Sequence, residues 1–192
     1  MSRVKELLDE LSPLLNYSSE DWNVLQEEAA VISEWIPDIV SVFYDTVYAS
    51  SDTSKIFHDG EREKLEKTLE NWVLSLASGQ QEDRFWEHQW IIALLHVQRG
   101  VNNLYMLAMM CRVQQVVLDK CMSHYDKQRA AVVYSAFHKI SSTIAALIAE
   151  CYGEVLLNST EVGLSKVGMN SALLQRIKST QIKKMLDEVG HG

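Results

Sequence analysis

The sequence EDRFWEHQWIIALLHVQRGVNNLYMLAMM occupies residues 82–110. It begins with charged residues, becomes almost wholly apolar, and places His96 at the end of the apolar run. Gly100 and the pair Asn102-Asn103 follow, and glycine commonly ends helices while asparagine caps their starts. This stretch therefore predicts a helix with His96 in its last turn, a tight corner at Gly100, and a second helix that begins with an asparagine cap.

His96 shares a predicted helix face with Gln89, Ile92 and Ala93. This face is mostly apolar, so the imidazole is poorly placed for contact with solvent. It is a core residue hydrogen-bonded to a carbonyl, a base with a shifted pKa, or a ligand to something buried. A core residue is the commonest role of a lone histidine on such a face, and the neighbouring residues leave all three roles open.

The composition indicates a single soluble all-α domain. The chain has 192 residues, enough for a sizeable core, and only two prolines and eight glycines. Its 18 basic and 26 acidic residues give a net charge of −8, which opposes a general role in nucleic-acid binding.

The cysteines and the apolar runs bear on the cellular compartment. Cys111, Cys121 and Cys151 form no CxxC pair. We do not expect the N-terminal stretch MSRVKELLDEL to be a signal peptide, because acidic residues interrupt its apolar pattern. An odd number of cysteines without a secretion signal favours reduced thiols in the cytoplasm. No apolar run approaches the roughly 20 residues that span a bilayer, so we expect no membrane segment.

Apolar residues at helical spacing predict a succession of helices along the chain. Pro37 suits the first turn of one of them, because its missing N–H costs nothing there. Gly60 is expected to break the chain between two others. The predicted helices cover residues 4–15, 18–34, 36–50, 61–78, 82–99, 102–125 and 126–157, with a short helical turn over 50–57. A break over 158–168 and an amphipathic tail helix over 173–189 follow.

Three patches match the motifs of one family in their order and spacing. They are Phe43-Tyr44, Leu65 to Leu69, and His96 to Tyr105. Over residues 18–157 the chain resembles globin-coupled sensors and protoglobins. The resemblance implies an all-α globin fold, a three-over-three helical sandwich, with an extra N-terminal helix and a C-terminal helical tail.

The resemblance also implies a haem site. His96 would ligate the iron of haem b, with its other N–H oriented by a carbonyl or by Gln89. Tyr44 and Thr68 would face a bound diatomic gas such as O2, CO or NO. The residues implied to line the haem pocket are Phe43, Tyr44, Leu65, Thr68, Leu69, Trp72, Ile92, Leu95, Met106 and Met109.

The distal side chains also have ordinary interpretations, and the chain departs from the family at one position. Tyr44 could be a boundary tyrosine with its hydroxyl in water, and a helical threonine such as Thr68 usually bonds the carbonyl one turn earlier. Met106 occupies the place where some relatives carry a second functional tyrosine. A signalling switch based on that tyrosine is therefore not expected here.

The last two long predicted helices are apolar on more than one face, which predicts a homodimer. The resemblance implies that the two helices of each chain form a four-helix bundle. Residues 1–157 would form the sensor globin domain, and residues 158–192 a hinge and a tail. The predicted seam consists of Val133, Phe137, Ile140, Ile144 and Ile148, with Val113 and Val117 opposite.

The leading hypothesis is a cytoplasmic sensor globin that binds oxygen or another gas at haem iron. It would signal through its dimer interface to a downstream protein. The alternative is a haem-free globin-like module that binds a partner. A metalloenzyme is disfavoured, because the sequence has no HExxH motif, nucleophile elbow or phosphate-binding glycine loop. We therefore expect no enzymatic activity.

Overall fold

A computed structural model describes residues 2–58, 60–78, 83–166, 176 and 179–180. Over these residues the chain is helical and contains no strand, which confirms the predicted all-α class. The helices are α1 (Arg3–Leu15), α2 (Ser19–Glu27), α3 (Ala29–Ala49), α4 (Arg62–Ala77), α5 (Asp83–Gln98), α6 (Asn103–His124) and α7 (Lys127–Lys166), with a 3-10 turn η1 (Ser54–Ile56).

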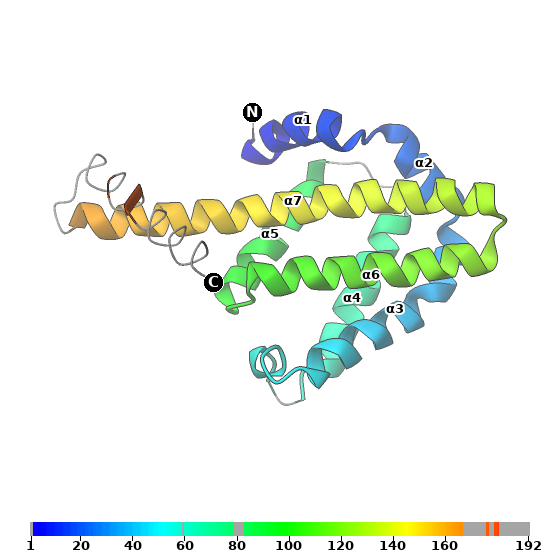
Figure 1. Cartoon of the computed structure of the whole chain (residues 1–192), viewed down its shortest axis with the longest axis horizontal. Helices are drawn as coiled ribbons and strands as arrows, with labels where there is room; N and C mark the ends of the chain where they lie inside the picture. The colour runs from blue at the N-terminus through cyan, green and yellow to red at the C-terminus, as the bar shows by residue number, and fades with distance from the viewer. Residues whose placement is uncertain (1, 59, 79–82, 167–175, 177–178, 181–192) are drawn as a thin grey trace, which may run out of the picture. The chain divides into compact units, whose positions relative to one another are not determined.

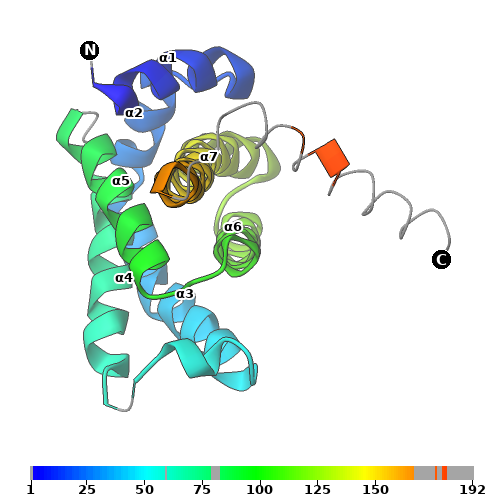
Figure 2. The same cartoon turned by 90° about the vertical axis from the view of Figure 1, so that its left-hand side faces the viewer.

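The chain divides into two compact units, Met1–Tyr152 and Gly153–Gly192. In the first unit, α3 packs against α4 and α6, α2 packs against α4, and α1 packs against α5. Helix α6 and the part of α7 in this unit lie side by side (Figure 1), and both are seen end-on beside α4 and α5 in Figure 2. Fully buried Trp22, Leu76, Phe137 and Ile140 belong to the core.

The junction between α2 and α3 differs from the prediction. A single helix was expected over residues 18–34, with a new helix beginning near Pro37. The structure instead breaks the helix at Glu28, whose backbone has φ −97° and ψ 9°. Pro37 lies inside α3. That prediction was wrong because contacts from a distant part of the chain determine where this helix ends.

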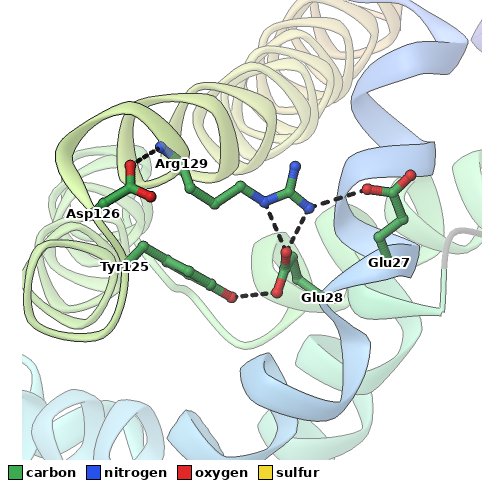
Figure 3. Close-up of polar contacts among 5 residues, drawn as sticks. All are labelled: Glu27, Glu28, Tyr125, Asp126 and Arg129. Atoms are coloured by element: carbon green, nitrogen blue, oxygen red, sulfur yellow. Dashed lines mark hydrogen bonds and ion pairs between the residues drawn. The ribbon is translucent and has the colours of Figure 1, made fainter.

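Those contacts come from the corner between α6 and α7 (Figure 3). The Glu28 carboxylate accepts hydrogen bonds from the Tyr125 hydroxyl at 2.6 Å and from Arg129 Nε at 2.8 Å. Arg129 Nη2 also pairs with Glu27 at 3.0 Å. Burial raises the pKa of Glu28, but the bonds from Tyr125 and Arg129 outweigh it and hold that pKa below its usual value. The Asp126 side chain caps α7 by accepting a hydrogen bond from the backbone N–H of Arg129 at 3.0 Å.

Helix α7 continues to Lys166, so the break predicted from residue 158 is absent over residues 158–166. The predicted tail helix over 173–189 lies outside the described residues, and the domain boundary at 157 stays a prediction. The stretch Lys127–Asn158 is long and apolar enough to cross a membrane by length and composition. A core helix passes the same test, and Ile144 and Leu147 of this stretch are fully buried.

Candidate functional site

An apolar cavity of about 230 Å³ lies in the first unit, with walls from α3, η1, α4, α5, α6 and α7. Its lining residues are Phe43, Tyr44, Val47, Thr53, Ile56, Phe57, Leu65, Thr68, Leu69, Trp72, Ile92, His96, Arg99, Val101, Tyr105, Met106, Met109, Met110, Val113 and Ile148. The three sequence patches that carry the family resemblance therefore meet around one space, although Phe43 and Tyr105 lie far apart in the sequence.

All the predicted pocket residues except Leu95 line this cavity. Leu95 is 51 % exposed. The cavity face of α5 carries Ile92 and His96, and Arg99 continues it just after the helix ends. Leu95 lies beside His96 in the sequence and therefore points about 100° away around the helix. The placement of Leu95 in the pocket was wrong for this reason.

Several lining residues were not predicted. Val47, Arg99 and Met110 lie three or four residues from predicted members, so helical spacing could have identified them. Phe57 lies in the chain after η1 and Ile148 on α7. Only tertiary packing brings these two to the cavity.

His96 presents an unpaired nitrogen in this setting. Its Nδ1 is buried and has no hydrogen-bond partner among the described residues. Burial lowers the pKa of His96, and the positive charge of Arg99 lowers it further. The imidazole is therefore neutral at physiological pH and retains a nitrogen lone pair that can bind a metal.

The corner after α5 fixes the backbone of His96. The Val101 N–H donates to the His96 carbonyl at 2.9 Å, and the Gly100 N–H donates to the Val97 carbonyl at 3.0 Å. This pair of bonds is a Schellman motif, which needs a left-handed residue, and Gly100 has φ +72°. Asn102 then caps α6 by accepting from the Leu104 N–H at 2.8 Å. The predicted helix end, corner and asparagine cap are confirmed.

Gln89 does not contact His96 as one prediction had it. Its side-chain oxygen accepts from the Trp72 indole N–H at 2.9 Å, and its side-chain nitrogen donates to the Phe85 carbonyl at 3.2 Å. The reason is that Gln89 lies nearly two helical turns before His96, beyond the reach of its side chain.

Tyr44 and Thr68 differ in what their hydroxyls can do. Tyr44 is 5 % exposed, its ring packs against Phe43 and Phe57, and its hydroxyl has no hydrogen bond among the described residues. Burial raises the pKa of Tyr44, which keeps the hydroxyl protonated. The Thr68 hydroxyl donates to the Lys64 carbonyl at 3.0 Å, which is the ordinary interpretation of a helical threonine.

Comparison with known proteins identifies the family. The family model for protoglobins matches residues 4–158. The chain belongs to the protoglobin family. No curated protein matches the sequence.

Solved structures similar to this protoglobin are globin domains. The globin domain of a Geobacter sulfurreducens globin-coupled sensor aligns with a TM-score of 0.70 at 22% identity, covering 76% of this chain and 97% of that one. The globin domain of E. coli DosC, in a ferric form, aligns with a TM-score of 0.63 at 15% identity, covering 76% of this chain and 99% of that one. These alignments confirm the predicted globin fold.

The residues of the cavity fit a haem group. A haem needs an apolar space and one protein nitrogen at its iron, and the cavity supplies both in a single place. Among the described residues, no group of three His, Cys, Asp or Glu side chains could hold a bare metal ion. Met106 lies in the cavity wall and is buried, so an apolar thioether takes the place of the second tyrosine.

Proposed function

We propose that this protoglobin is a sensor that binds haem b and, at its iron, oxygen or another diatomic gas. The observation that carries the proposal is the buried, unpaired Nδ1 of a neutral His96 on the wall of an apolar cavity. A buried polar atom without a partner is costly, so native proteins rarely retain one without a function. A ring nitrogen of His96 would hold the haem iron, and that iron would supply the chemistry that binds the gas.

The other cavity residues have distinct roles in this proposal. Leu65, Leu69 and Ile92 exclude water from the site, which slows oxidation of ferrous iron. The Tyr44 hydroxyl is free to donate a hydrogen bond into the cavity, and it would stabilise a bound gas that carries partial negative charge. Thr68 contributes less, because its proton is already committed to the Lys64 carbonyl.

The proposal includes a homodimer, but not through the seam predicted from the sequence. The seven residues of that seam are all buried within the single chain. They are core residues because α6 and α7 direct their most apolar faces toward the rest of the globin domain. Within the first unit, the large exposed apolar residues of these two helices are Leu104, Leu107, Leu118, Met122 and Val132.

These exposed residues are the proposed dimer surface, and their spacing supports it. Those on α6 recur at spacings of three, eleven and four residues, and exposed Cys111 lies between them, so they share one helix face. A soluble monomer rarely leaves such a stripe uncovered, and a second copy of the chain covers it with matching chemistry. We place the protein in the cytoplasm, where its free cysteines remain reduced, and expect a downstream protein to receive the signal.

Purification with added haemin tests the proposed function. We expect a Soret band with one haem per chain, and loss of that band in His96→Ala unless free imidazole is supplied. His88→Ala is the matched control, since His88 is an exposed histidine on the same helix. A wild-type protein that stays colourless would instead support the haem-free module, which acts only through its surface.

A further inference from the structure

Arg99 is the single charged side chain among the described residues that line the cavity. Its guanidinium forms a two-point contact with the Glu61 carboxylate, Nη1 to Oε1 at 3.0 Å and Nη2 to Oε2 at 2.8 Å. Glu61 Oε1 also accepts a hydrogen bond from the backbone N–H of His58 at 2.8 Å. Glu61 is therefore held from two sides, and it holds the guanidinium in one orientation.

The Arg99–Glu61 pair lies close in the chain to His96, the proposed iron ligand. Arg99 follows the last residue of α5 and lies three residues after His96. Glu61 directly precedes α4, the helix that supplies Leu65 and Thr68 to the cavity. The pair thus bridges the end of one cavity wall and the start of another.

The guanidinium also remains accessible on one side. The Arg99 side chain is 42 % exposed, whereas that of Glu61 is only 15 % exposed. A guanidinium carries further N–H donors beyond the two that Glu61 uses, and its planar shape suits a second carboxylate. Arg99 can therefore bind an anion at the cavity without releasing Glu61.

We propose that Arg99 is the carboxylate-binding group of the cavity, which recognises a propionate of the haem, and that Glu61 is its positioning residue. This inference rests on the proposed function, because haem is an apolar macrocycle that carries two carboxylates. An amphiphilic ligand of that kind needs an apolar cavity with a cation at its edge, and the described lining residues offer one cation.

Other basic residues nearby do not compete for this role. Arg62 follows Glu61 but pairs with Asp45 at 2.7 Å and with Glu66 at 2.6 Å, and it does not line the cavity. Lys64 and Lys67 line a separate, polar depression along the outside of α4. Arg62 is consequently a matched control for removal of a positive charge at the same end of α4.

The test compares the affinity of the full-length protein for haem and for haem dimethyl ester, in which both carboxylates are blocked. We expect wild type to prefer haem by about tenfold, since a charge-assisted two-point contact at a partly exposed site is of that size. Arg99→Gln should abolish the preference, and Arg99→Lys should restore part of it. Arg62→Gln should leave the preference unchanged.

Glu61→Gln separates carboxylate recognition from a merely structural contact. If Arg99 served only to bind Glu61, Glu61→Gln and Arg99→Gln would weaken haem and its ester equally. Our proposal requires Glu61→Gln to retain most of the preference for haem. An unchanged preference in Arg99→Gln, in a protein that still shows a Soret band, would overturn the inference. Absence of that band in wild type would overturn the proposed function instead.

Discussion

The indole N–H of Trp72 donates to the side-chain oxygen of Gln89 across 2.9 Å and ties α4 to α5 beside the cavity. Gln89 is fully buried, and its nitrogen donates to the Phe85 carbonyl. Both ends of this amide are therefore occupied, which explains a glutamine on an otherwise apolar helix face. The bond joins the helix that carries His96 to the helix that carries Thr68.

Gln89→Leu tests the contribution of this bond. Leucine has a similar volume but leaves the half-buried indole N–H of Trp72 without its acceptor, which should lower the free energy of unfolding by about 1–3 kcal/mol. Urea unfolding of the haem-free protein measures the change. Gln98→Leu, an exposed position on the same helix, should change stability by less than about 0.5 kcal/mol. Equal stability of the two variants would show that the bond contributes nothing.

Tyr44→Phe removes the hydroxyl proposed to bind oxygen. A charge-assisted hydrogen bond of about 1.5–3 kcal/mol corresponds to an oxygen dissociation rate roughly ten- to a hundredfold faster. Carbon monoxide is a poorer acceptor and should respond much less. Stopped-flow displacement of oxygen measures the rate. Because burial raises the pKa of Tyr44, the wild-type rate should also stay constant between about pH 6 and 9.

Thr68→Val is the companion variant, and the structure lowers its expected effect. The Thr68 hydroxyl already donates its hydrogen bond to the Lys64 carbonyl. We therefore expect the oxygen dissociation rate to increase by less than about threefold. A larger effect in Thr68→Val than in Tyr44→Phe would reverse the assignment of the main donor.

Gly100→Ala should destabilise the corner after α5. Gly100 has φ +72° and open space where a Cβ would lie, so the cost is backbone strain of about 1 kcal/mol. Gly153→Ala is the matched change inside α7, where a Cβ also meets nothing within 4 Å. It should stabilise the helix by about 0.5–1 kcal/mol. Thermal unfolding measures the two changes in stability, which should have opposite signs. If both variants shifted the melting temperature in the same direction, the assignment of the Gly100 turn would be contradicted.

Leu107→Glu with Leu118→Glu should convert the proposed dimer into a monomer. The two side chains are exposed on α6, and a pair of charges facing their symmetry mates would repel. Light scattering should report a mass falling to 21.9 kDa. The double variant Ile91→Glu with Leu94→Glu is the control, because these residues form an equally exposed apolar pair on α5. A wild-type monomer at micromolar concentration would refute the dimer.

The contacts of Glu28 predict a dependence of stability on pH. Its folded pKa is held below the usual 4.5, so the contribution is present above about pH 4.5 and is lost as pH falls through the folded value. Tyr125 and Arg129 face the carboxylate, with Glu27 and the His124 charge nearby. Arg129→Met should therefore cost about 1–2 kcal/mol at pH 7 and much less at pH 3.

Lys55→Met is the control for this experiment, because Lys55 pairs with Asp52 in a contact whose side chains are 74 % and 69 % exposed. Exposed ion pairs contribute about 0–1 kcal/mol, so this variant should change little at either pH. Urea midpoints at the two pH values supply the comparison. A cost for Arg129→Met that is the same at pH 3 and pH 7 would contradict the role of Glu28.

Local signals in the sequence were sufficient for the corner after α5, whereas most of the cavity residues were predicted from the family resemblance of three short patches. The order His96, Gly100, Asn102 specifies a helix end and a cap through backbone chemistry that needs no distant partner. The break at Glu28 could not be predicted, since it depends on Arg129, about a hundred residues away. The predicted dimer seam was wrong for the same reason. The sequence does not show whether an apolar residue such as Phe137 is covered by its own chain or by a second copy.

The bond from Val101 to His96 has a mechanical consequence. It joins the last turn of α5 to the residue just before the Asn102 cap, so the backbone of His96 is connected to the start of α6 through one short corner. The first turn of that helix carries Leu104 on the outer surface and is followed at once by Met106 in the cavity wall. The residue that points into the cavity from α5 is therefore linked, through this corner, to a helix that lines the cavity on one side and reaches the outer surface on the other.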